Sequence, residues 1–363
     1  MPPSAYPTGP RQRPTDPLSP PPPECPYRDQ AGAWVLSRYS DVLAALRASD
    51  LYQVAPQGRV DSTPRERVRR LQVRDEVAAA ITHSKLAEWR ERITPLAQQR
   101  IAGLPRDRPV DLLADFVQPL SLALALIVLD PAPAHRDHLT DLHRSLFARV
   151  PVRPDSERTP GKLRAWWQHG RIKSRRRNAK AELMRFFRVA GPPGGEALFL
   201  GISDTLPRFL ANALLALLRS PAEMARLRAR PESIPRAVEE LLRYGGLVHT
   251  LCREATNDVE LGGVTIARGG RVILRPASAN RDPDVFAAPD LLDTARLPGG
   301  HVSLGFGDHS CAGAALVRMA AGVVVHAFVQ NAADAELAGD VEWQTGTVLV
   351  SPVALNVVLN ALP

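Results

Sequence analysis

The sequence is poor in cysteine. Its three cysteines, Cys25, Cys252 and Cys311, lie far apart. They form no disulfide framework and no Cys-x-x-Cys pair, so we expect the chain to work in a reducing compartment and not as a disulfide scaffold or a zinc finger. A reactive or metal-binding cysteine in this chain would therefore depend on the residues around it and not on a second cysteine.

Secretion and membrane signals are also missing. The N-terminus is rich in proline and lacks the charged-then-apolar order of a signal peptide, and we expect no stretch to be apolar for long enough to cross a bilayer. The sequence thus predicts a cytoplasmic protein with no membrane partner. With 363 residues, 45% of them hydrophobic, it can bury a core that encloses a cofactor.

Acidic residues are too few to balance the basic ones, and the formal net charge is +8. From Arg153 to Lys180 ten basic residues oppose only Asp155 and Glu157, so this segment supplies the whole excess. A basic run can be a solvated helix face, or it can bind an acidic partner such as nucleic acid. Charge alone does not distinguish these alternatives.

The pattern of apolar residues predicts a mainly α fold with small β-sheets (α+β). Residues 1–24 form an irregular, proline-rich lead-in. Helical spacing predicts helices at about 40–47, 63–104, 112–129, 196–219, 221–230 and 233–244. Short β-like pieces are predicted at 34–39, 259–266, 271–274 and 348–359. Ser40 or Asp41 would cap the first helix.

Cys311 ends a glycine-punctuated loop, residues 304–313 with the sequence LGFGDHSCAG, that opens onto an apolar stretch reaching about Phe328. The unpaired N–H groups at a helix N-terminus favour a thiolate, and a thiolate is a metal ligand. Gly305 and Gly307 would allow the loop to turn, and Gly313 would leave room for a flat cofactor.

Two other interpretations of this loop stay open on spacing alone. A lone cysteine before a helix is often only a small buried hydrophobe. A zinc site from His301, His309 and Cys311 would lack a nearby fourth ligand.

The loop resembles the haem-binding loop of the cytochrome P450 family, a Gly-x-Gly-x-(His or Arg)-x-Cys-x-Gly string. The resemblance runs from about Cys25 to the C-terminus and implies one cytochrome P450 domain over residues 25–363. It implies that Cys311 binds the iron of haem b, which is buried between a central oxygen-binding helix and the helix after the cysteine loop. Leu304 departs from the family, which usually has phenylalanine there.

A second motif is Glu240 and Arg243, three residues apart and hence on one face of a helix. Such a pair on a surface is worth under ~1 kcal/mol. It is similar, however, to the Glu-x-x-Arg signature of the family, whose pair is buried behind the haem and joined by a second arginine. Arg296 occupies the corresponding place, and Asn280-Arg281-Asp282-Pro283 resembles the family's meander.

The segment from Gly201 to Pro207 is similar to the oxygen-handling part of the family's central helix. By this resemblance Thr205 hydrogen-bonds oxygen or its water, and Asp204 gates protons from solvent. Ile202 stands where glycine is usual, and Pro207 lacks an N–H for the carbonyl of Ser203, so we expect a kink there. These departures leave room for an atypical or O2-independent reaction.

The resemblance also assigns cofactor anchors and pocket walls. Arg70 and Arg74 would meet the haem propionates where the family has a His-x-x-x-Arg pair, and Arg253 and His309 would add further donors. The residues expected to shape the substrate pocket are Gly201, Ile202, Val248, His249, Thr250 and the segment 345–350 that includes Val348.

The implied activity is that of a soluble haem-thiolate monooxygenase, which activates O2 at iron and oxidises a small organic molecule, most simply by hydroxylation in secondary metabolism. The sequence carries no flavin or nicotinamide fingerprint, so electrons would come from an external ferredoxin and reductase. The basic run would lie in the lid over the substrate channel. There it is either solvated or binds an acidic or carrier-protein-bound substrate. A nucleic-acid-binding protein would leave the cysteine loop unexplained, and no nucleic acid partner is expected.

Overall fold

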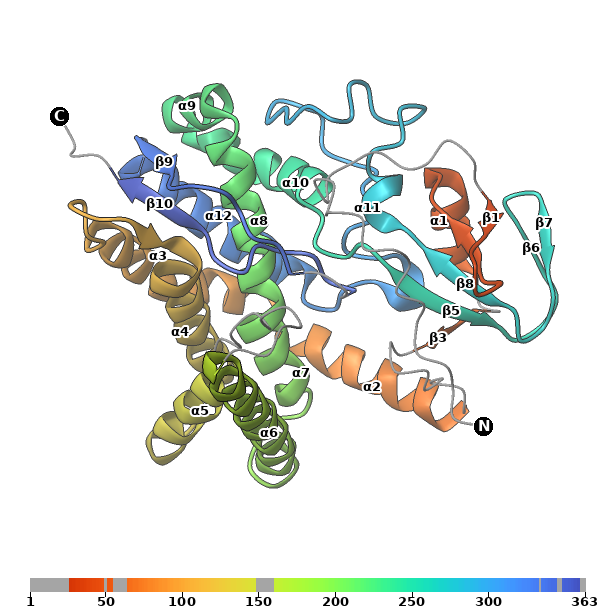
Figure 1. Ribbon diagram of the computed structural model, residues 1–363, viewed down its shortest axis with the longest axis horizontal. Coiled ribbons are helices and arrows are strands. Elements are labelled where there is room, and N and C mark those ends of the chain that lie inside the picture. Colours follow the sequence, from red (N-terminus) through yellow and green to blue (C-terminus); the bar gives the residue numbers. More distant parts are fainter. Residues whose placement is uncertain are drawn as a thin grey trace.

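The structure is a computed structural model, and it describes residues 26–48, 51–54, 64–147, 160–332, 334–344 and 348–359. The predicted lead-in over residues 1–24 lies outside these ranges. The described chain is mainly helical, with three small sheets at its margins (Figure 1). This architecture is the α+β fold that the sequence predicts.

Helices make up most of the body. The α-helices are α1 (Tyr39–Arg47), α2 (Pro64–Ala80), α3 (His83–Ala102), α4 (Gln118–Leu129), α5 (Pro133–Leu146), α6 (Pro160–Val189), α7 (Gly195–Leu200), α8 (Leu206–Leu218), α9 (Pro221–Ala229), α10 (Ile234–Tyr244), α11 (Pro276–Ala279) and α12 (Ala314–Asn331). Two π-helical segments, η1 (Leu112–Val117) and η2 (Gly201–Thr205), and two 3-10 turns, η3 (Pro231–Ser233) and η4 (Gly307–His309), complete the set.

The strands form one mixed sheet and two smaller units. Their bounds are β1 (Tyr27–Arg28), β2 (Trp34–Leu36), β3 (Leu51–Val54), β4 (Val110–Asp111), β5 (Leu251–Ala255), β6 (Val259–Leu261), β7 (Val264–Ile266), β8 (Arg271–Leu274), β9 (Ala335–Leu337) and β10 (Asn356–Leu359). The largest sheet has the order β1-β2-β8-β5-β3, and only β2 and β8 pair in parallel. The others are β4-β10-β9 and the hairpin β6-β7.

The first helix begins one residue earlier than predicted and is capped differently. Arg38 occupies the N-cap and makes no side-chain cap hydrogen bond. The backbone N–H of Tyr39 instead donates to Asp282 Oδ2 at 2.8 Å. The cap therefore comes from a residue of the meander, far along the chain, and the prediction of Ser40 or Asp41 was wrong.

Helix α8 is the centre of the molecule (Figure 1). Every one of its residues except Arg208 is buried. A helix that is apolar all round must be enclosed by other helices, and α9, α10 and α12 pack against α8. The consecutive elements α7, η2 and α8 thus form the predicted oxygen helix, which runs through the core.

Two apolar helical segments contradict the expectation that no stretch is long enough to span a bilayer. Leu112–Leu129 and Ala314–Asn331 pass that test by length and composition, with mean hydropathy 2.1 and 1.3. Half of each segment is buried inside the molecule. Burial among other helices accounts for their apolar character, as in any large core.

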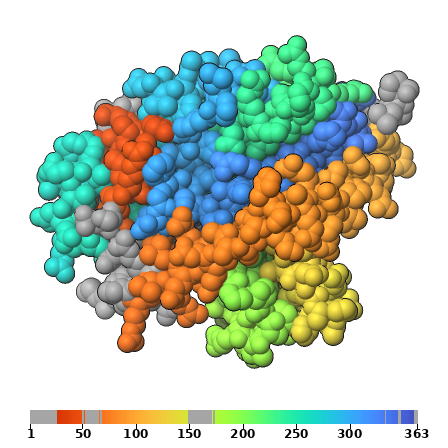
Figure 2. Space-filling model, turned by 180° about the vertical axis from the view of Figure 1, so that it is seen from behind, coloured from red at the N-terminus to blue at the C-terminus, as the bar shows by residue number. Residues whose placement is uncertain are grey.

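Helices α5 and α6 pack against each other and form a lobe at one side of the body. Figure 2 shows this lobe, in yellow and lime, below the orange band of α2 and α3. The described part of the basic run lies on α6. Arg171, Arg175, Arg177 and Lys180 are exposed there, whereas Arg153 and Arg158 lie outside the described residues.

Candidate active site around Cys311

A cavity of about 510 Å³ lies between the oxygen helix and the cysteine loop. Helix α2 closes one side, and η2 with the start of α8 faces the loop and the start of α12. The predicted site residues that line it are Arg70, Arg74, Gly201, Ile202, Thr205, Val248, Arg253, Gly305, His309, Cys311 and Gly313. Residues predicted from four separate parts of the sequence therefore meet at one cavity.

The cysteine loop is held in shape by its own backbone. The N–H of Cys311 donates to the carbonyl of Leu304 at 2.7 Å. Gly305 has φ +70°, and a Cβ there would lie 2.3 Å from the His309 carbonyl oxygen. Only glycine fits this position. At Gly313 a Cβ would meet only Cys311 Sγ, at 3.9 Å, so this residue leaves space on the cysteine side of the cavity.

The environment of the Cys311 sulfur differs from the sequence expectation. Burial raises the pKa of the Cys311 thiol above its ordinary value, and this outweighs the opposing effects of the Gly313 backbone and the Arg318 charge. The expectation that the helix N-terminus by itself favours the ionised sulfur was wrong, because the thiol opens onto an apolar cavity. A coordinated metal deprotonates a thiol regardless of this effect.

Leu304 also lines the cavity and packs against the main core. At the position where the family usually has phenylalanine, this chain thus places a smaller apolar side chain.

Basic side chains gather along one part of the cavity wall. Arg70 donates to the carbonyl of Asp308 at 3.2 Å and lies 3.0 Å from His309 Nδ1. Arg74 donates to Ser310 Oγ at 2.7 Å. Helix α2 is thereby tied to the cysteine loop through two arginines one turn apart.

Arg253 is the most deeply buried of these cations. Burial and the nearby charge of Arg70 lower its pKa to about 10. Nε of Arg253 and Nε of Arg74 are buried without a hydrogen-bond partner among the described residues. Buried donors need acceptors, and carboxylates at the rim of a flat cofactor supply them. The cavity therefore fits a haem, with an apolar interior, one thiol and a cationic edge.

The oxygen helix widens where it passes the cavity. Residues 201–205 form π turns, and the N–H of Leu206 donates to the Gly201 carbonyl five residues back. Pro207 cannot donate, and its ring crowds the turn before it, so a wider turn relieves the conflict. The helix carries a π-bulge beside Thr205, directly before the proline where a kink is expected.

The remaining oxygen-helix residues take different positions. A Cβ on Gly201 would meet nothing within 4 Å, and Ile202 is buried at the cavity wall. Asp204 does not line the cavity. Its carboxylate accepts from Arg208 Nε at 2.8 Å, and Arg208 also bonds Gln344. The acid is thus held at the outer side of the helix.

His249, Thr250 and Val348 are not among the described residues that line the cavity. The N–H of His249 donates to the Val348 carbonyl at 3.0 Å. Burial lowers the pKa of His249 to about 4, so the ring is neutral at ordinary pH. Residues 345–347 of the predicted pocket wall lie outside the described chain.

Glu240 and Arg243 form a buried, bidentate ion pair. Arg243 donates to both Glu240 oxygens at 2.7 and 2.8 Å, and each side chain is 2% exposed. Arg296 reaches the same carboxylate at 3.1 Å. Arg243 further donates to the carbonyls of Asn280 and Pro289. The structure therefore joins helix α10, the meander and Arg296 in one buried network.

Sequence reasoning missed two functional neighbours. Arg208 follows Asp204 by one helical turn, and this i,i+4 spacing is a signal that could have revealed the pair. Ser310 accepts from Arg74, but no sequence pattern links residues so far apart. The zinc alternative fails because His301 turns to Glu239 and His309 to Arg70. No group of three or more ligand side chains in the described chain could hold a metal ion.

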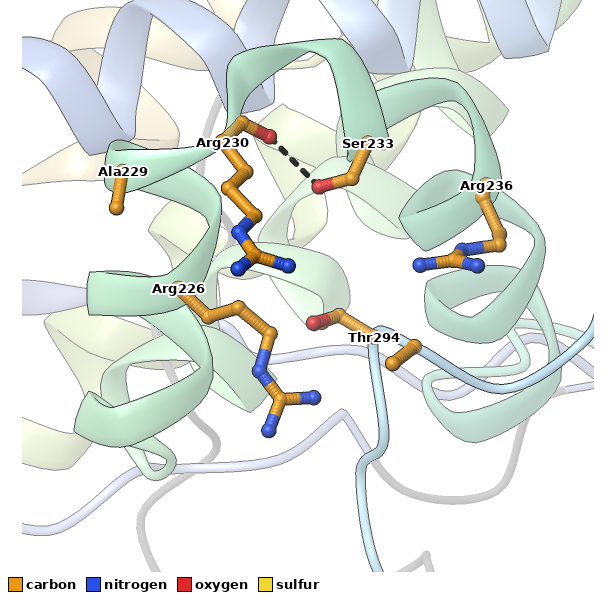
Figure 3. A pocket seen from close by; sticks show the side chains of 7 residues that line it. Arg226, Ala229, Arg230, Ser233, Arg236 and Thr294 are labelled. Carbon is orange, nitrogen blue, oxygen red and sulfur yellow. Dashed lines mark hydrogen bonds between the residues drawn. The ribbon is translucent and has the colours of Figure 1, made fainter.

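A separate hollow of about 410 Å³ lies at α9 and α10 (Figure 3). Arg226, Arg230 and Arg236 point toward it, and Thr294 lies between them. Arg226 pairs there with Glu223 and Asp293 at 3.5 Å. None of the predicted site residues that the structure describes lines this hollow.

Comparison with known proteins identifies the class that this fold and site define. Residues 232–333 match the model of the family described as Cytochrome P450. Nocardicin C N-oxygenase of Nocardia uniformis subsp. tsuyamanensis is 31% identical over 89% of this chain and 89% of its own length. The biotin biosynthesis cytochrome P450 of Bacillus subtilis is 38% identical, but over only 39% of this chain and 35% of that relative.

The fold comparison agrees with the sequence comparison. The cytochrome P450 PksS of the Bacillus subtilis bacillaene polyketide synthase has a TM-score of 0.73 and 25% identity, covering 93% of this chain and 94% of that one. The chain belongs to the cytochrome P450 family. It is a haem-dependent cytochrome P450 monooxygenase that oxidises a small organic molecule.

Proposed function

We propose that the cavity beside Cys311 would hold haem b, with the Cys311 sulfur binding its iron. The observation that carries this proposal is the meeting of the thiol with Arg70, Arg74, Arg253 and His309 around one apolar cavity. The four basic side chains would bind the propionates, and Gly305 and Gly313 would let the loop approach the cofactor closely. Residues 25–363 would then act as one domain.

Haem ligated by a thiolate supplies O2 activation, because the sulfur donates electron density that favours O–O cleavage. The remaining tasks belong to the side chains of the chain itself. Ile202, Leu206 and Val248 exclude water from the cavity and hold an apolar substrate. Glu240, Arg243 and Arg296 hold the meander against α10, and so support the cysteine loop from behind.

Proton supply is the task we assign to Thr205 and Asp204. Thr205 lies at the cavity, where its hydroxyl can hold a proton at Oγ1. Asp204 faces outward with its carboxylate on Arg208 and is 34% exposed. Release of Asp204 from Arg208 would let it pass a proton from solvent toward Thr205. The π turns widen the helix between the two environments and take the place of the missing glycine at Ile202.

Oxygen-dependent oxidation is the reaction that the relatives favour over an O2-independent one. Relatives that match most of the chain are named as an N-oxygenase and a vitamin D(3) 25-hydroxylase. We propose hydroxylation of an apolar metabolite, with electrons from an external ferredoxin and reductase in the cytoplasm.

Helix α6 supports the hypothesis of an acidic or carrier-bound substrate. Arg171, Arg175 and Arg177 are exposed on it, whereas Arg176 is half-buried and its pKa is lowered by burial and by Arg208. One fold neighbour, P450BioI, was solved with an acyl carrier protein ligated to hexadec-9Z-enoic acid, at TM-score 0.71 and 21% identity over 91% of this chain and 93% of that one. A carrier would bring negative charge to the exposed arginines.

Spin-state titration with hexadec-9Z-enoic acid, free and linked to acyl carrier protein, tests the carrier hypothesis. The Arg175→Glu/Arg177→Glu variant should bind the linked acid at least tenfold more weakly, and the loss should shrink at high salt. Arg90→Glu/Arg100→Glu, two exposed arginines of α3, is the matched control. Equal binding by all three proteins would leave α6 as a solvated lid.

The ferrous carbon monoxide spectrum tests haem ligation by Cys311. The parent should give the thiolate-type Soret band, and Cys311→Ser should lose it while the variant stays folded by circular dichroism. A thiolate-type band in Cys311→Ser would refute the assignment.

A further inference from the structure

Glu239 precedes the buried Glu240 but makes contacts of its own. Its carboxylate accepts from Arg318 Nε at 2.7 Å and from Arg318 Nη2 at 2.9 Å, a bidentate pair. Oε2 also lies 3.2 Å from His301 Nε2. One carboxylate on α10 thus contacts helix α12 and the segment that leads into the cysteine loop.

The three side chains differ in their exposure. His301 is 6% exposed, Glu239 is 19% exposed and Arg318 is 42% exposed. The two basic partners lower the pKa of Glu239 to about 2 against the opposing effect of burial. Glu239 is therefore ionised at neutral pH.

Arg318 brings a positive charge to the helix that follows the cysteine loop. It lies on α12, about two helical turns after Cys311, which precedes the first residue of that helix. A positive charge near a thiolate stabilises it and weakens its donation to a bound metal. Glu239 opposes this effect because it neutralises Arg318 at contact distance.

We propose that Glu239 and Arg318 form a charge pair that sets the reduction potential of the haem bound at Cys311, and that Glu239 positions the cysteine loop through His301. This proposal rests on the proposed function, because it needs haem ligated by Cys311. Neither residue touches the substrate cavity, so both act through the cysteine side as positioning residues.

The signs of the expected effects follow from charge. Reduction of the iron adds an electron, and a nearby positive charge favours the reduced form. Glu239→Gln leaves Arg318 unopposed and raises the potential. Arg318→Gln leaves the Glu239 carboxylate unopposed and lowers it. The double variant removes one charge of each sign and returns close to the parent.

Spectroelectrochemical titration of the haem-loaded proteins measures these shifts. Because Arg318 is partly exposed, each single shift should become smaller at high salt. Glu239→Asp and Arg318→Lys keep the charges and should stay near the parent potential. Asp141→Asn, in an exposed pair with Arg144 on the remote helix α5, removes one negative charge elsewhere and should leave the potential unchanged.

Potential shifts of the same sign in both single variants would overturn the proposal, because a purely structural defect would loosen the cysteine loop in the same way whether Glu239 or Arg318 is replaced. The absence of a shift in both variants would also overturn it. Should Glu239→Gln fail to load haem, the exposed Arg318→Gln still gives the test. A parent protein with no thiolate-type carbon monoxide spectrum would instead refute the proposed function, so the two failures are distinguishable.

Discussion

At the scale of single residues, burial decides what each basic side chain can do. Arg253 and Arg90 are the same residue type, but Arg253 is 2% exposed at the cavity and Arg90 lies on the surface of α3. A buried guanidinium without an acid beside it is costly unless an anion joins it. Arg253 therefore points to a bound carboxylate, and Arg90 does not.

Replacement of Arg253 should weaken haem binding. Arg253→Leu removes charged hydrogen bonds worth about 1.5–3 kcal/mol, so we expect at least tenfold weaker haem retention. Arg253→Lys keeps the charge but lacks the planar guanidinium that binds a carboxylate through two hydrogen bonds. Its haem retention should lie between that of the parent and that of Arg253→Leu. Transfer of haem to apomyoglobin measures the loss, and Arg90→Leu is the control. Unchanged retention in Arg253→Leu would remove this residue from the haem anchor.

Replacement of Thr205 should uncouple electron use from product formation. Thr205→Ala removes the hydroxyl at the cavity, and a general acid–base group contributes about 10²–10⁴-fold, so product per electron consumed should fall several-fold. The haem spectrum should stay normal. Thr205→Ser keeps the hydroxyl and should retain most of the coupling. Equal coupling in all three proteins would exclude a role for Thr205 in proton supply.

The residue types of the cysteine loop could be predicted from sequence, but the energetics of its sulfur could not. The Gly-x-Gly pattern before a helix indicates that the cysteine lies in a tight loop, but not which distant side chains surround its sulfur. Whether burial or the helix end dominates its pKa depends on Leu316 and Val317 and on cavity walls from distant segments. For the same reason His249 was expected in the pocket wall, whereas it is not among the described residues that line the cavity.

At the scale of elements, the oxygen helix shows both what local sequence predicts and where it stops. Pro207 correctly indicated a disturbance, because a missing N–H is a local property. A kink, a π-bulge or both together would satisfy that local constraint. Whether the turns widen depends on how Ile202, Leu206 and Phe209 pack against the surrounding core, which no single-sequence pattern contains.

The Glu240–Arg243 pair should be essential for a folded holoprotein. Glu240→Ala takes the shared carboxylate away from Arg243 and Arg296, and Arg243→Ala removes the bidentate partner of Glu240 and leaves it with Arg296. Breaking a buried pair in this way costs about 3–5 kcal/mol. We expect little soluble, haem-loaded protein from either variant. The yield of haem per polypeptide after purification measures this.

Lys85 and Glu88 on α3 provide the matched control. They have the same i,i+3 spacing and are joined at 2.8 Å, but both are exposed. Glu88→Ala should therefore express and load haem like the parent. Normal haem incorporation in Glu240→Ala would show that the buried network is dispensable.

At the scale of the whole molecule, the order of motifs predicted the family and the fold class, while long-range pairing stayed hidden. Strand β2 pairs in parallel with β8, and Asp282 caps a helix that begins at Tyr39. Both contacts join segments more than 200 residues apart. Sequence periodicity reports which face of an element is apolar, but not which distant element covers it.

Acid should destabilise the whole molecule before its carboxylates titrate. Burial lowers the pKa values of His143 and His249 from 6.5 to about 4. Between these values the unfolded chain binds protons that the folded chain does not, so the free energy of unfolding falls as pH falls. The loss should approach about 3 kcal/mol per histidine at the lower end. Glu239 has a pKa of about 2 against an ordinary value of 4.5. Its protonation therefore lowers the free energy of unfolding only below about pH 4.5.

Urea unfolding from about pH 8 to about pH 5 measures this slope. His143→Gln should flatten it, because glutamine takes up no proton in the unfolded chain. His83, exposed at the start of α3, is the control, and His83→Gln should keep the slope of the parent. A parent whose unfolding free energy does not change over this range would show that the buried rings titrate normally. In that case solvent would have to reach both histidines, and the core around η2 and Val248 would be wetter than its packing indicates.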